Sequence, residues 1–258
     1  MENKLKIAVI TGASSGIGKK FCELLPNNFS FDEVWVIARN QSRLEELKNI
    51  LPYKIRVLPL DLSKEESYQK LLDLLKEVNP EIGLLINASG FGKFELSTNI
   101  PLNESLNMID LNCKAIVATC QICLEFMKEG AKIINVASVA AFQPIPYINV
   151  YGATKSFVLS YTRALNSELK QRKIVATAVC PFWTKTEFFN RAVSENAVIK
   201  KYVVMYDPEK VVKKGYKDLR KGKDKSIYGF KAKFQVMLVK LLPHSLVMKV
   251  WKKQQKLK

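Results

Sequence analysis

Residues 7–18 decide the fold, and they read IAVITGASSGIG. Ile7–Thr11 is a short apolar run rich in Val and Ile, which is typical of a buried strand in a parallel sheet. A glycine-rich loop follows, and a helical pattern begins at once over residues 17–25. Glycines let such a loop approach a pyrophosphate, and the first helical N–H groups can bind it. The strand–loop–helix context favours a dinucleotide site over a plain tight turn.

The same alternation continues along the chain. Further apolar runs are Val34–Ala38, Ile55–Leu60, Leu84–Asn87, Lys132–Ala137 and Ile174–Cys180. Longer helical patterns lie between them, near residues 41–49, 64–78, 103–129 and 151–171. Repeated strand–helix units predict an α/β fold, a doubly wound parallel sheet of the Rossmann type with helices on both faces. All strands would then end at one edge, which is where such sheets bind ligands.

Composition agrees with a folded globular protein. The 258 residues are 48% hydrophobic and 25% charged, which argues against a disordered or collagen-like chain. No uncharged apolar stretch is long enough to cross a membrane, and no signal-like segment opens the sequence, so the cytoplasm is the expected location. Five irregularly spaced cysteines argue against a disulfide framework. Cys120 and Cys123 are predicted core residues, and His244, the sole histidine, predicts no metal site.

The end of the second predicted strand bears on the choice of cofactor. It reads Val36-Ile37-Ala38-Arg39-Asn40, without the acid that would hold an adenosine ribose. A guanidinium at this point suits a 2′-phosphate, so Arg39 favours NADP over NAD. The alternative is that Arg39 is a solvated loop residue.

A second group of residues carries proton chemistry. Tyr151 and Lys155 stand four apart at the start of a helical pattern and would share one face. A free tyrosine has a pKa near 10, and a nearby ammonium lowers it. Ser138 follows the fifth predicted strand, at the same edge of the sheet.

These residues and the loop Thr11-Gly12-Ala13-Ser14-Ser15-Gly16-Ile17-Gly18 resemble the short-chain dehydrogenases/reductases of about 250 residues. The loop spacing is G-x-x-x-G-x-G, and Ser138, Tyr151 and Lys155 are similar to the catalytic set of that family. Asn112 falls where the family has a fourth catalytic residue. The resemblance extends from residue 5 to about residue 190.

The resemblance implies a role for each catalytic residue. Tyr151 would exchange a proton with the substrate oxygen as hydride moves to or from the nicotinamide, and Ser138 would hydrogen-bond that oxygen. Lys155 would lower the pKa of Tyr151 and bind the nicotinamide ribose, while Asn112 would hold a water linked to Lys155. We therefore expect an NADP-dependent oxidoreductase that interconverts an apolar ketone or aldehyde and its alcohol. The rival hypothesis is a catalytically inactive dinucleotide-binding regulator or scaffold, against which the intact set argues.

The cofactor site implied by the resemblance extends over several loops. It comprises Gly12, Ser14, Ser15, Gly16, Ile17, Gly18, Arg39, Asp61, Leu62, Asn87, Ala88, Ser89, Gly90, Tyr151, Lys155, Pro181, Thr184 and Thr186. Asp61 corresponds to the acid beside the adenine, and Thr186 to the threonine that contacts the carboxamide. The chain departs from the family at Ala88, where an asparagine is usual, and at Phe182, where a glycine is usual. A glycine often marks a backbone position with positive φ, which a phenylalanine rarely adopts, so Phe182 bears on the backbone conformation at this position.

Several aromatic residues lie in loops that we expect at the edge of the sheet where the strands end. They are Phe91, Phe94, Phe142, Phe182, Trp183, Phe188 and Phe189. Such a cluster predicts an apolar substrate, with packing against the core as the alternative for each ring. Only Lys185 is a candidate for recognising a substrate carboxylate.

The long helical patterns resemble those through which the family pairs its subunits. Residues suited to a two-fold contact are Ala115, Ala118, Phe157 and Tyr161. The expected assembly is a homodimer or homotetramer.

The C-terminal region is strongly basic. Residues 201–258 hold 17 Lys and Arg against 4 Asp and Glu, whereas residues 1–200 are nearly balanced at 24 and 20. We expect one dinucleotide-binding catalytic domain over residues 1–230 and a basic amphipathic helical extension over residues 231–258. In that extension Leu246, Val247, Val250 and Trp251 would share one side, largely opposite the lysines. The helix would either lie on an anionic membrane or pack on its own body. Nucleic acid is not an expected partner, because no binding motif accompanies the charge.

Overall fold

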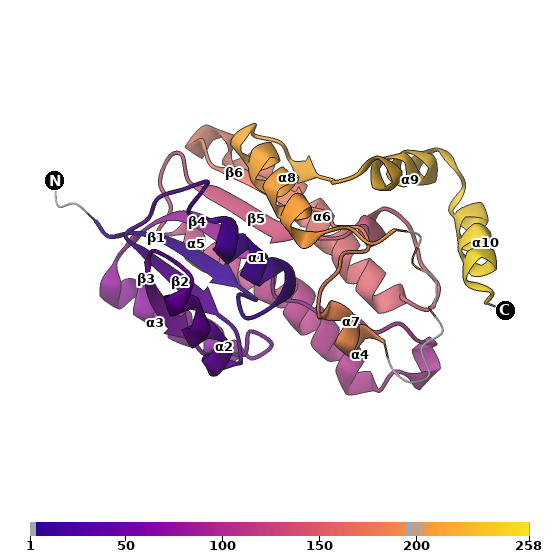
Figure 1. The fold of residues 1–258 in the computed structure, drawn as a ribbon, viewed down its shortest axis with the longest axis horizontal. Coiled ribbons are helices and arrows are strands. Elements are labelled where there is room, and N and C mark those ends of the chain that lie inside the picture. The colour runs from indigo at the N-terminus through magenta and orange to yellow at the C-terminus, as the bar shows by residue number, and fades with distance from the viewer. Residues whose placement is uncertain (1–3, 194–198, 200–201, 203, 258) are drawn as a thin grey trace.

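A seven-stranded parallel sheet forms the centre of the molecule in a computed structural model (Figure 1). The structure describes residues 4–193, 199, 202 and 204–257. The strand order is β3-β2-β1-β4-β5-β6-β7, and every neighbouring pair is parallel. The strands are β1 (Lys6–Thr11), β2 (Glu33–Ile37), β3 (Lys54–Leu58), β4 (Glu81–Asn87), β5 (Lys132–Val136), β6 (Val175–Val179) and β7 (Lys225–Ser226). The predicted doubly wound fold is confirmed.

Helices cover both faces of the sheet. The α-helices of the described residues are α1 (Gly16–Leu24), α2 (Gln41–Glu45), α3 (Glu65–Val78), α4 (Leu102–Ile109), α5 (Ala115–Leu124), α6 (Asn149–Glu168), α7 (Phe188–Ala192), α8 (Pro208–Arg220), α9 (Phe230–Leu241) and α10 (His244–Gln255). Alternate strand residues point to opposite faces. Val9 therefore packs with α3, α5 and α6, whereas Ile10 packs with α1, α2 and α8. Burial on both faces explains why the strands read as continuous apolar runs.

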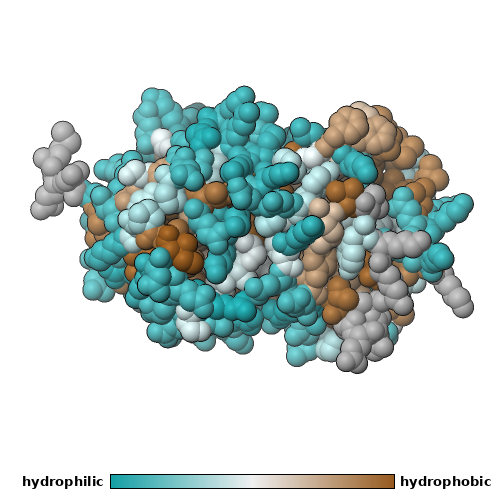
Figure 2. Space-filling model, viewed as in Figure 1, coloured by the Kyte–Doolittle hydropathy of each residue, from teal (hydrophilic) through white to brown (hydrophobic). Residues whose placement is uncertain are grey.

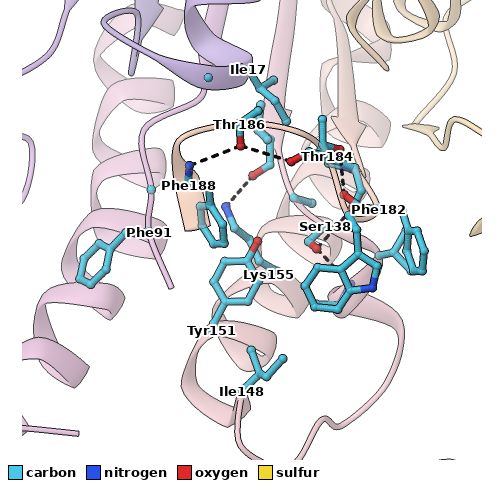
Figure 3. Close-up of a pocket in the computed structure, with 18 of the residues that line it drawn as sticks. Ile17, Phe91, Ser138, Ile148, Tyr151, Lys155, Phe182, Thr184, Thr186 and Phe188 are labelled. Carbon is cyan, nitrogen blue, oxygen red and sulfur yellow. Dashed lines mark hydrogen bonds between the residues drawn. The ribbon is translucent and has the colours of Figure 1, made fainter. Parts of the chain in front are cut away.

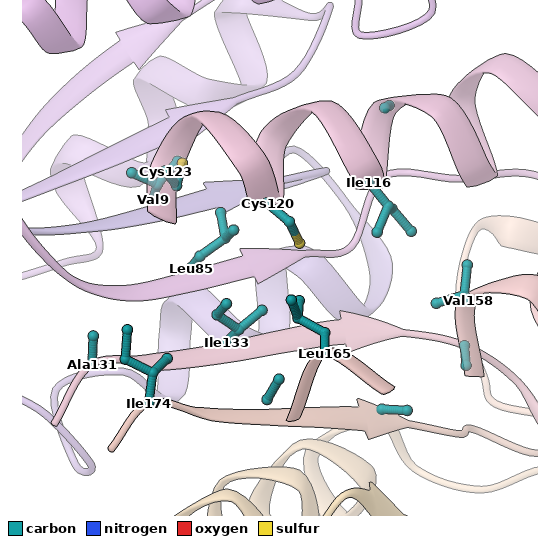
Figure 4. Packing of buried hydrophobic residues seen from close by; sticks show 14 of the residues in the cluster. Val9, Leu85, Ile116, Cys120, Cys123, Ala131, Ile133, Val158, Leu165 and Ile174 are labelled. Atoms are coloured by element: carbon teal, nitrogen blue, oxygen red, sulfur yellow. The ribbon is translucent and has the colours of Figure 1, made fainter. Parts of the chain in front are cut away.

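The packing of the core tests two predictions, one for Cys120 and Cys123 and one for Ala115. Cys120 and Cys123 are buried, and on α5 they face strand residues such as Leu85 (Figure 4). Burial raises the pKa of the Cys120 thiol to about 12. Ala115 also lies in this core with 3% of its surface exposed, so its predicted place in a subunit contact is wrong.

The helix predicted over residues 103–129 is interrupted. A π turn over Asp110–Lys114 separates α4 from α5, and α5 ends at Leu124. A π turn inserts one extra residue and re-aims the side chains around it, often at functional sites. Here it lies between two helices beside the active edge and carries Asn112. Periodicity alone had no signal for it.

Two helices follow the last strand at the far end of the molecule (Figure 1). Pro243 separates α9 from α10, as predicted, and His244 is the exposed first residue of α10. Val247 and Trp251 are buried, and the Trp251 indole donates a hydrogen bond of 3.0 Å to the Pro146 carbonyl. The Trp251 side chain therefore packs on the body of the protein, which is the second of the two alternatives for this helix. Among the helices described, none has the length and apolar character needed to span a bilayer.

Candidate active site

The glycine-rich loop lies at the point where the strand order reverses. Strand β1 has β2 on one side and β4 on the other, which opens a crevice beyond its carboxyl end. Gly12 has φ +67°, and a Cβ on Gly18 would stand 2.1 Å from the Gly12 carbonyl oxygen. Only glycine permits this close turn, which directs the N-terminus of α1 into the crevice.

A cleft of about 1140 Å³ runs from this loop past the start of α6 and out to α9 and α10. It brings together every predicted cofactor residue except Asn87. The Asn87 side chain is instead buried beneath the cleft, where its amide donates 2.9 Å to Asn135 and its oxygen accepts 2.9 Å from Thr119. Asn87 thus positions the strand end and does not face a ligand.

Charged side chains surround one end of the cleft. Arg39 is exposed there, beside Asp61 and Arg43. Burial tends to raise the pKa of Asp61, but hydrogen bonds from Ser63 and the nearby Arg39 outweigh burial and lower it. Arg43 pairs with Glu187 at 2.6 Å. We did not predict Arg43 as a site residue, although its position four residues after Arg39 was a usable signal.

Ser138, Tyr151 and Lys155 meet at the centre of the cleft (Figure 3). Ser138 follows β5, and its hydroxyl accepts 3.1 Å from the Ala140 N–H. Tyr151 and Lys155 lie one turn apart in α6. The Lys155 ammonium donates 2.8 Å to the Val136 carbonyl and lies 5.7 Å from the Tyr151 ring centroid. The Lys155 amine and the hydroxyls of Ser138 and Tyr151 therefore lie together in the cleft, although the loop after β5 and α6 are separate elements.

Burial dominates the electrostatics of this group. It raises the pKa of Tyr151 to about 12, opposed by a hydrogen bond with Ser138. Burial lowers the pKa of Lys155 to about 8, although the nearby thiols of Cys113 and Cys180 tend to raise it. The direction for Tyr151 is opposite to the one expected from the sequence, because desolvation disfavours the phenolate. At neutral pH Tyr151 keeps its proton.

Asn112 is fully buried in the π turn and does not line the cleft. Its amide donates 2.9 Å to the Phe91 carbonyl and 3.0 Å to Thr154, and its oxygen accepts 3.1 Å from the Phe91 N–H. Both amide hydrogens are thus committed, and one lone pair of the oxygen remains. The side chain ties the segment after β4 to α6, one residue before Lys155.

The two departures from the family leave the backbone intact. Phe182 is not among the residues with positive φ, so a side chain there causes no strain. The N–H groups of Ala88 and Ser89 each donate 3.2 Å to the Thr11 hydroxyl, which holds this segment against β1.

Aromatic rings surround the other end of the cleft. Phe94 and Phe188 lie 6.1 Å and 5.4 Å from Tyr151, between ring centroids. All the predicted aromatic residues line the cleft except Phe142, which packs on the core near Lys240. The Phe91 ring points away from Tyr151 (Figure 3) and is covered by the Arg191 guanidinium at 3.4 Å. Lys185 is exposed and does not line the cleft.

The C-terminal helices complete this wall, which sequence reasoning missed. The apolar lining residues from α9, α10 and the turn between them are Phe230, Phe234, Leu238, Val239, Leu242, Val247, Val250 and Trp251. The available signal was the apolar spacing of residues 230, 234 and 238 along one helix face. The extension is therefore part of the cleft and not an appendage.

Comparison with known proteins agrees with this geometry. The short chain dehydrogenase family model matches residues 6–197. A very-long-chain 3-oxoacyl-CoA reductase of Danio rerio is 33% identical over 193 residues, 70% of this chain and 60% of that protein. An uncharacterized oxidoreductase of Staphylococcus aureus is 31% identical over 68% of this chain and 77% of its own.

A solved structure shows the same likeness. The short-chain dehydrogenase from Sphingobium yanoikuyae in complex with NADPH is 25% identical, with a TM-score of 0.76 over 90% of this chain and 92% of that one. The family match covers most of the chain, including the glycine-rich loop and all of Ser138, Tyr151 and Lys155. The chain belongs to the short-chain dehydrogenase family.

Proposed function

We propose that the protein is an NADP-dependent oxidoreductase that interconverts an apolar ketone or aldehyde and its alcohol in the cytoplasm. The observation that carries the proposal is the meeting of Ser138, Tyr151 and Lys155 midway between a glycine-rich loop and an aromatic pocket. The close turn at Gly12 and the N-terminus of α1 fit a pyrophosphate. Asp61 and Leu62 would hold the adenine, Lys155 the nicotinamide ribose, and Thr184 and Thr186 the carboxamide. A nicotinamide bound there would supply or accept the hydride.

The proton chemistry belongs to this chain's own residues. In reduction, Tyr151 donates its phenolic proton to the substrate oxygen while Ser138 hydrogen-bonds that oxygen. The cationic Lys155 stabilises the tyrosinate that remains, and a water on the free lone pair of Asn112 would return a proton. With its pKa raised to about 12, Tyr151 carries its proton at neutral pH and is therefore in the form that can donate it. Oxidation of the alcohol needs the tyrosinate form of Tyr151. The rate of oxidation should therefore rise as the pH increases toward the Tyr151 pKa of about 12.

A substrate screen tests this function. The purified protein would be given NADPH and a series of ketones and aldehydes of increasing apolar size, and NADPH consumption would be followed. We expect turnover with bulky apolar carbonyls, since the pocket is lined by Phe94, Trp183, Phe188 and Phe189. The name of the zebrafish relative supports long-chain substrates in the same series. Tight NADPH binding without turnover of any carbonyl would favour the regulator or scaffold instead.

Replacing Arg39 by aspartate is expected to weaken NADPH binding by about 10- to 100-fold, the loss of one charge-assisted hydrogen bond. The introduced carboxylate repels a 2′-phosphate but can accept hydrogen bonds from a ribose, so NADH binding should hold or improve. Fluorescence titration gives both dissociation constants, and NADH serves as the control within the same variant. An unchanged NADPH constant would make Arg39 a solvated loop residue.

We also propose a homodimer or homotetramer built on α4 and α6. Leu102, Leu106 and Phe157 are 74%, 51% and 42% exposed, and the Phe157 ring stacks on Tyr161 at 5.9 Å. Monomeric proteins rarely leave such a patch uncovered. Phe157→Glu should therefore halve the mass measured by light scattering, while Ile50→Glu, exposed elsewhere, should leave it unchanged. A wild-type monomer at working concentration would contradict the proposal.

A further inference from the structure

Exposed apolar side chains concentrate on the C-terminal helices. Of the fourteen large hydrophobic residues that stand exposed in the described chain, eight belong to α9, α10 and the turn between them. We call this set the apolar ridge: Phe230, Phe234, Met237, Leu238, Leu241, Leu242, Leu246 and Val250. Phe230 and Leu241 are the most exposed, at 82% and 75%. Figure 2 shows apolar side chains gathered over α9, at the upper right.

The apolar ridge is continuous with the wall of the cleft. Phe230, Phe234, Leu238, Leu242 and Val250 are exposed and yet line the cleft. Met237, Leu241 and Leu246 do not line it and belong to the outer side of the ridge. An apolar surface therefore runs from the outside of the protein toward the ring of Tyr151.

Lysines surround the apolar ridge. Residues 225–258 contain nine lysines and no Asp or Glu. Lys231, Lys233, Lys240, Lys249 and Lys253 are exposed. None of them takes part in an ion pair among the residues that the structure describes. Apolar side chains rimmed by uncompensated lysines match an anionic lipid surface in both respects.

The charge also decides against a second copy of the chain as the occupant. A two-fold contact brings the same patch of both subunits together. Here it would set one group of unpaired lysines against the same group of the partner, which is unfavourable. An anionic bilayer supplies the opposite charge and an apolar interior.

We propose that the apolar ridge docks on an anionic membrane surface, so that the open end of the cleft faces lipid and an apolar substrate enters from the bilayer. The docking uses the outer side of α9 and the start of α10, while Trp251 remains packed against Pro146. Entry of substrate from lipid rests on the proposed function, but the docking itself does not.

Vesicle sedimentation with the full chain, without substrate or cofactor, tests the docking. We expect the wild type to bind phosphatidylcholine vesicles that contain phosphatidylserine, to bind pure phosphatidylcholine poorly, and to be released by high salt. Met237→Ser with Leu241→Ser removes two outer residues of the ridge and should lower binding about 10-fold or more. Lys249→Gln with Lys253→Gln should weaken binding and flatten its salt dependence.

A matched control removes similar apolar area elsewhere. Ile50 and Leu96 are 49% and 46% exposed away from the ridge, so Ile50→Ser with Leu96→Ser should bind vesicles like the wild type. The M237S/L241S variant should keep its turnover of a water-soluble ketone, since neither residue lines the cleft. The docking would be overturned if the wild type did not bind vesicles that contain phosphatidylserine, or if M237S/L241S bound them as well as the wild type. A drop in mass by light scattering in that variant, without vesicle binding in the wild type, would assign the ridge to a contact between copies.

Discussion

Tyr151→Phe is expected to lower kcat by about 10²- to 10⁴-fold, the usual contribution of a positioned general acid or base. The phenylalanine ring keeps its packing on Phe94 and Phe188 and loses only the proton donor. The dissociation constant for NADPH should therefore stay close to the wild-type value. NADPH consumption with the best ketone of the screen measures kcat, and fluorescence titration measures cofactor binding.

Tyr53→Phe is the matched control for that variant. The Tyr53 hydroxyl donates to the Phe29 carbonyl, far from the cleft, so its loss should cost about 1 kcal/mol of stability without changing kcat. If Tyr151→Phe turns over near the wild-type rate while remaining folded by circular dichroism, Tyr151 is not the acid. The same result would remove the main support for the proposed mechanism.

Gly18→Ala should weaken NADPH binding by about 100-fold, which corresponds to strain of up to about 3 kcal/mol from overpacking. The added Cβ would stand 2.1 Å from the Gly12 carbonyl oxygen, which is backbone and cannot swing aside. The loop must open, and the N-terminus of α1 then leaves its place in the cleft. Titration with NADPH and the melting temperature report the two effects.

Gly152→Ala is the control for Gly18→Ala. It shows what a glycine-to-alanine change in a helix does when the added Cβ clashes with no backbone atom. Gly152 also lies in a helix, but the nearest atom to its added Cβ would be 3.8 Å away. Alanine there should stabilise the helix by about 0.5–1 kcal/mol and leave NADPH binding intact. Equal NADPH affinity in Gly18→Ala and the wild type would show that the close turn is not needed to bind the cofactor.

Local pattern was enough for the sheet, whereas the central site residues also needed the family resemblance that their motifs carry together. The strands are buried on both faces, so each reads as an apolar run whatever its neighbours are. The resemblance could be applied to Ser138, Tyr151 and Lys155 because each follows closely on the end of a predicted strand or the start of a predicted helix. Their convergence then follows from parallel strands ending at one edge.

The errors arose where distant parts of the chain decide the outcome. The π turn around Asn112 depends on the hydrogen bonds that its side chain makes with Phe91 and Thr154. The raised pKa of Tyr151 depends on how many loops bury the ring, which spacing along α6 cannot reveal. The burial of Trp251 depends on the Pro146 carbonyl, more than a hundred residues away in the chain.

The position of the three tryptophans gives the molecule a built-in optical signal. Trp35 lies inside the sheet with no exposed surface, whereas Trp183 and Trp251 both line the cleft. Indole emission shifts toward the blue as water around the ring is replaced by apolar groups. A substrate that fills this end of the cleft thus alters two of the three emitters and leaves the third as an internal reference. The unlabelled protein can therefore report occupancy of its own pocket by intrinsic fluorescence, even for a compound that it never converts.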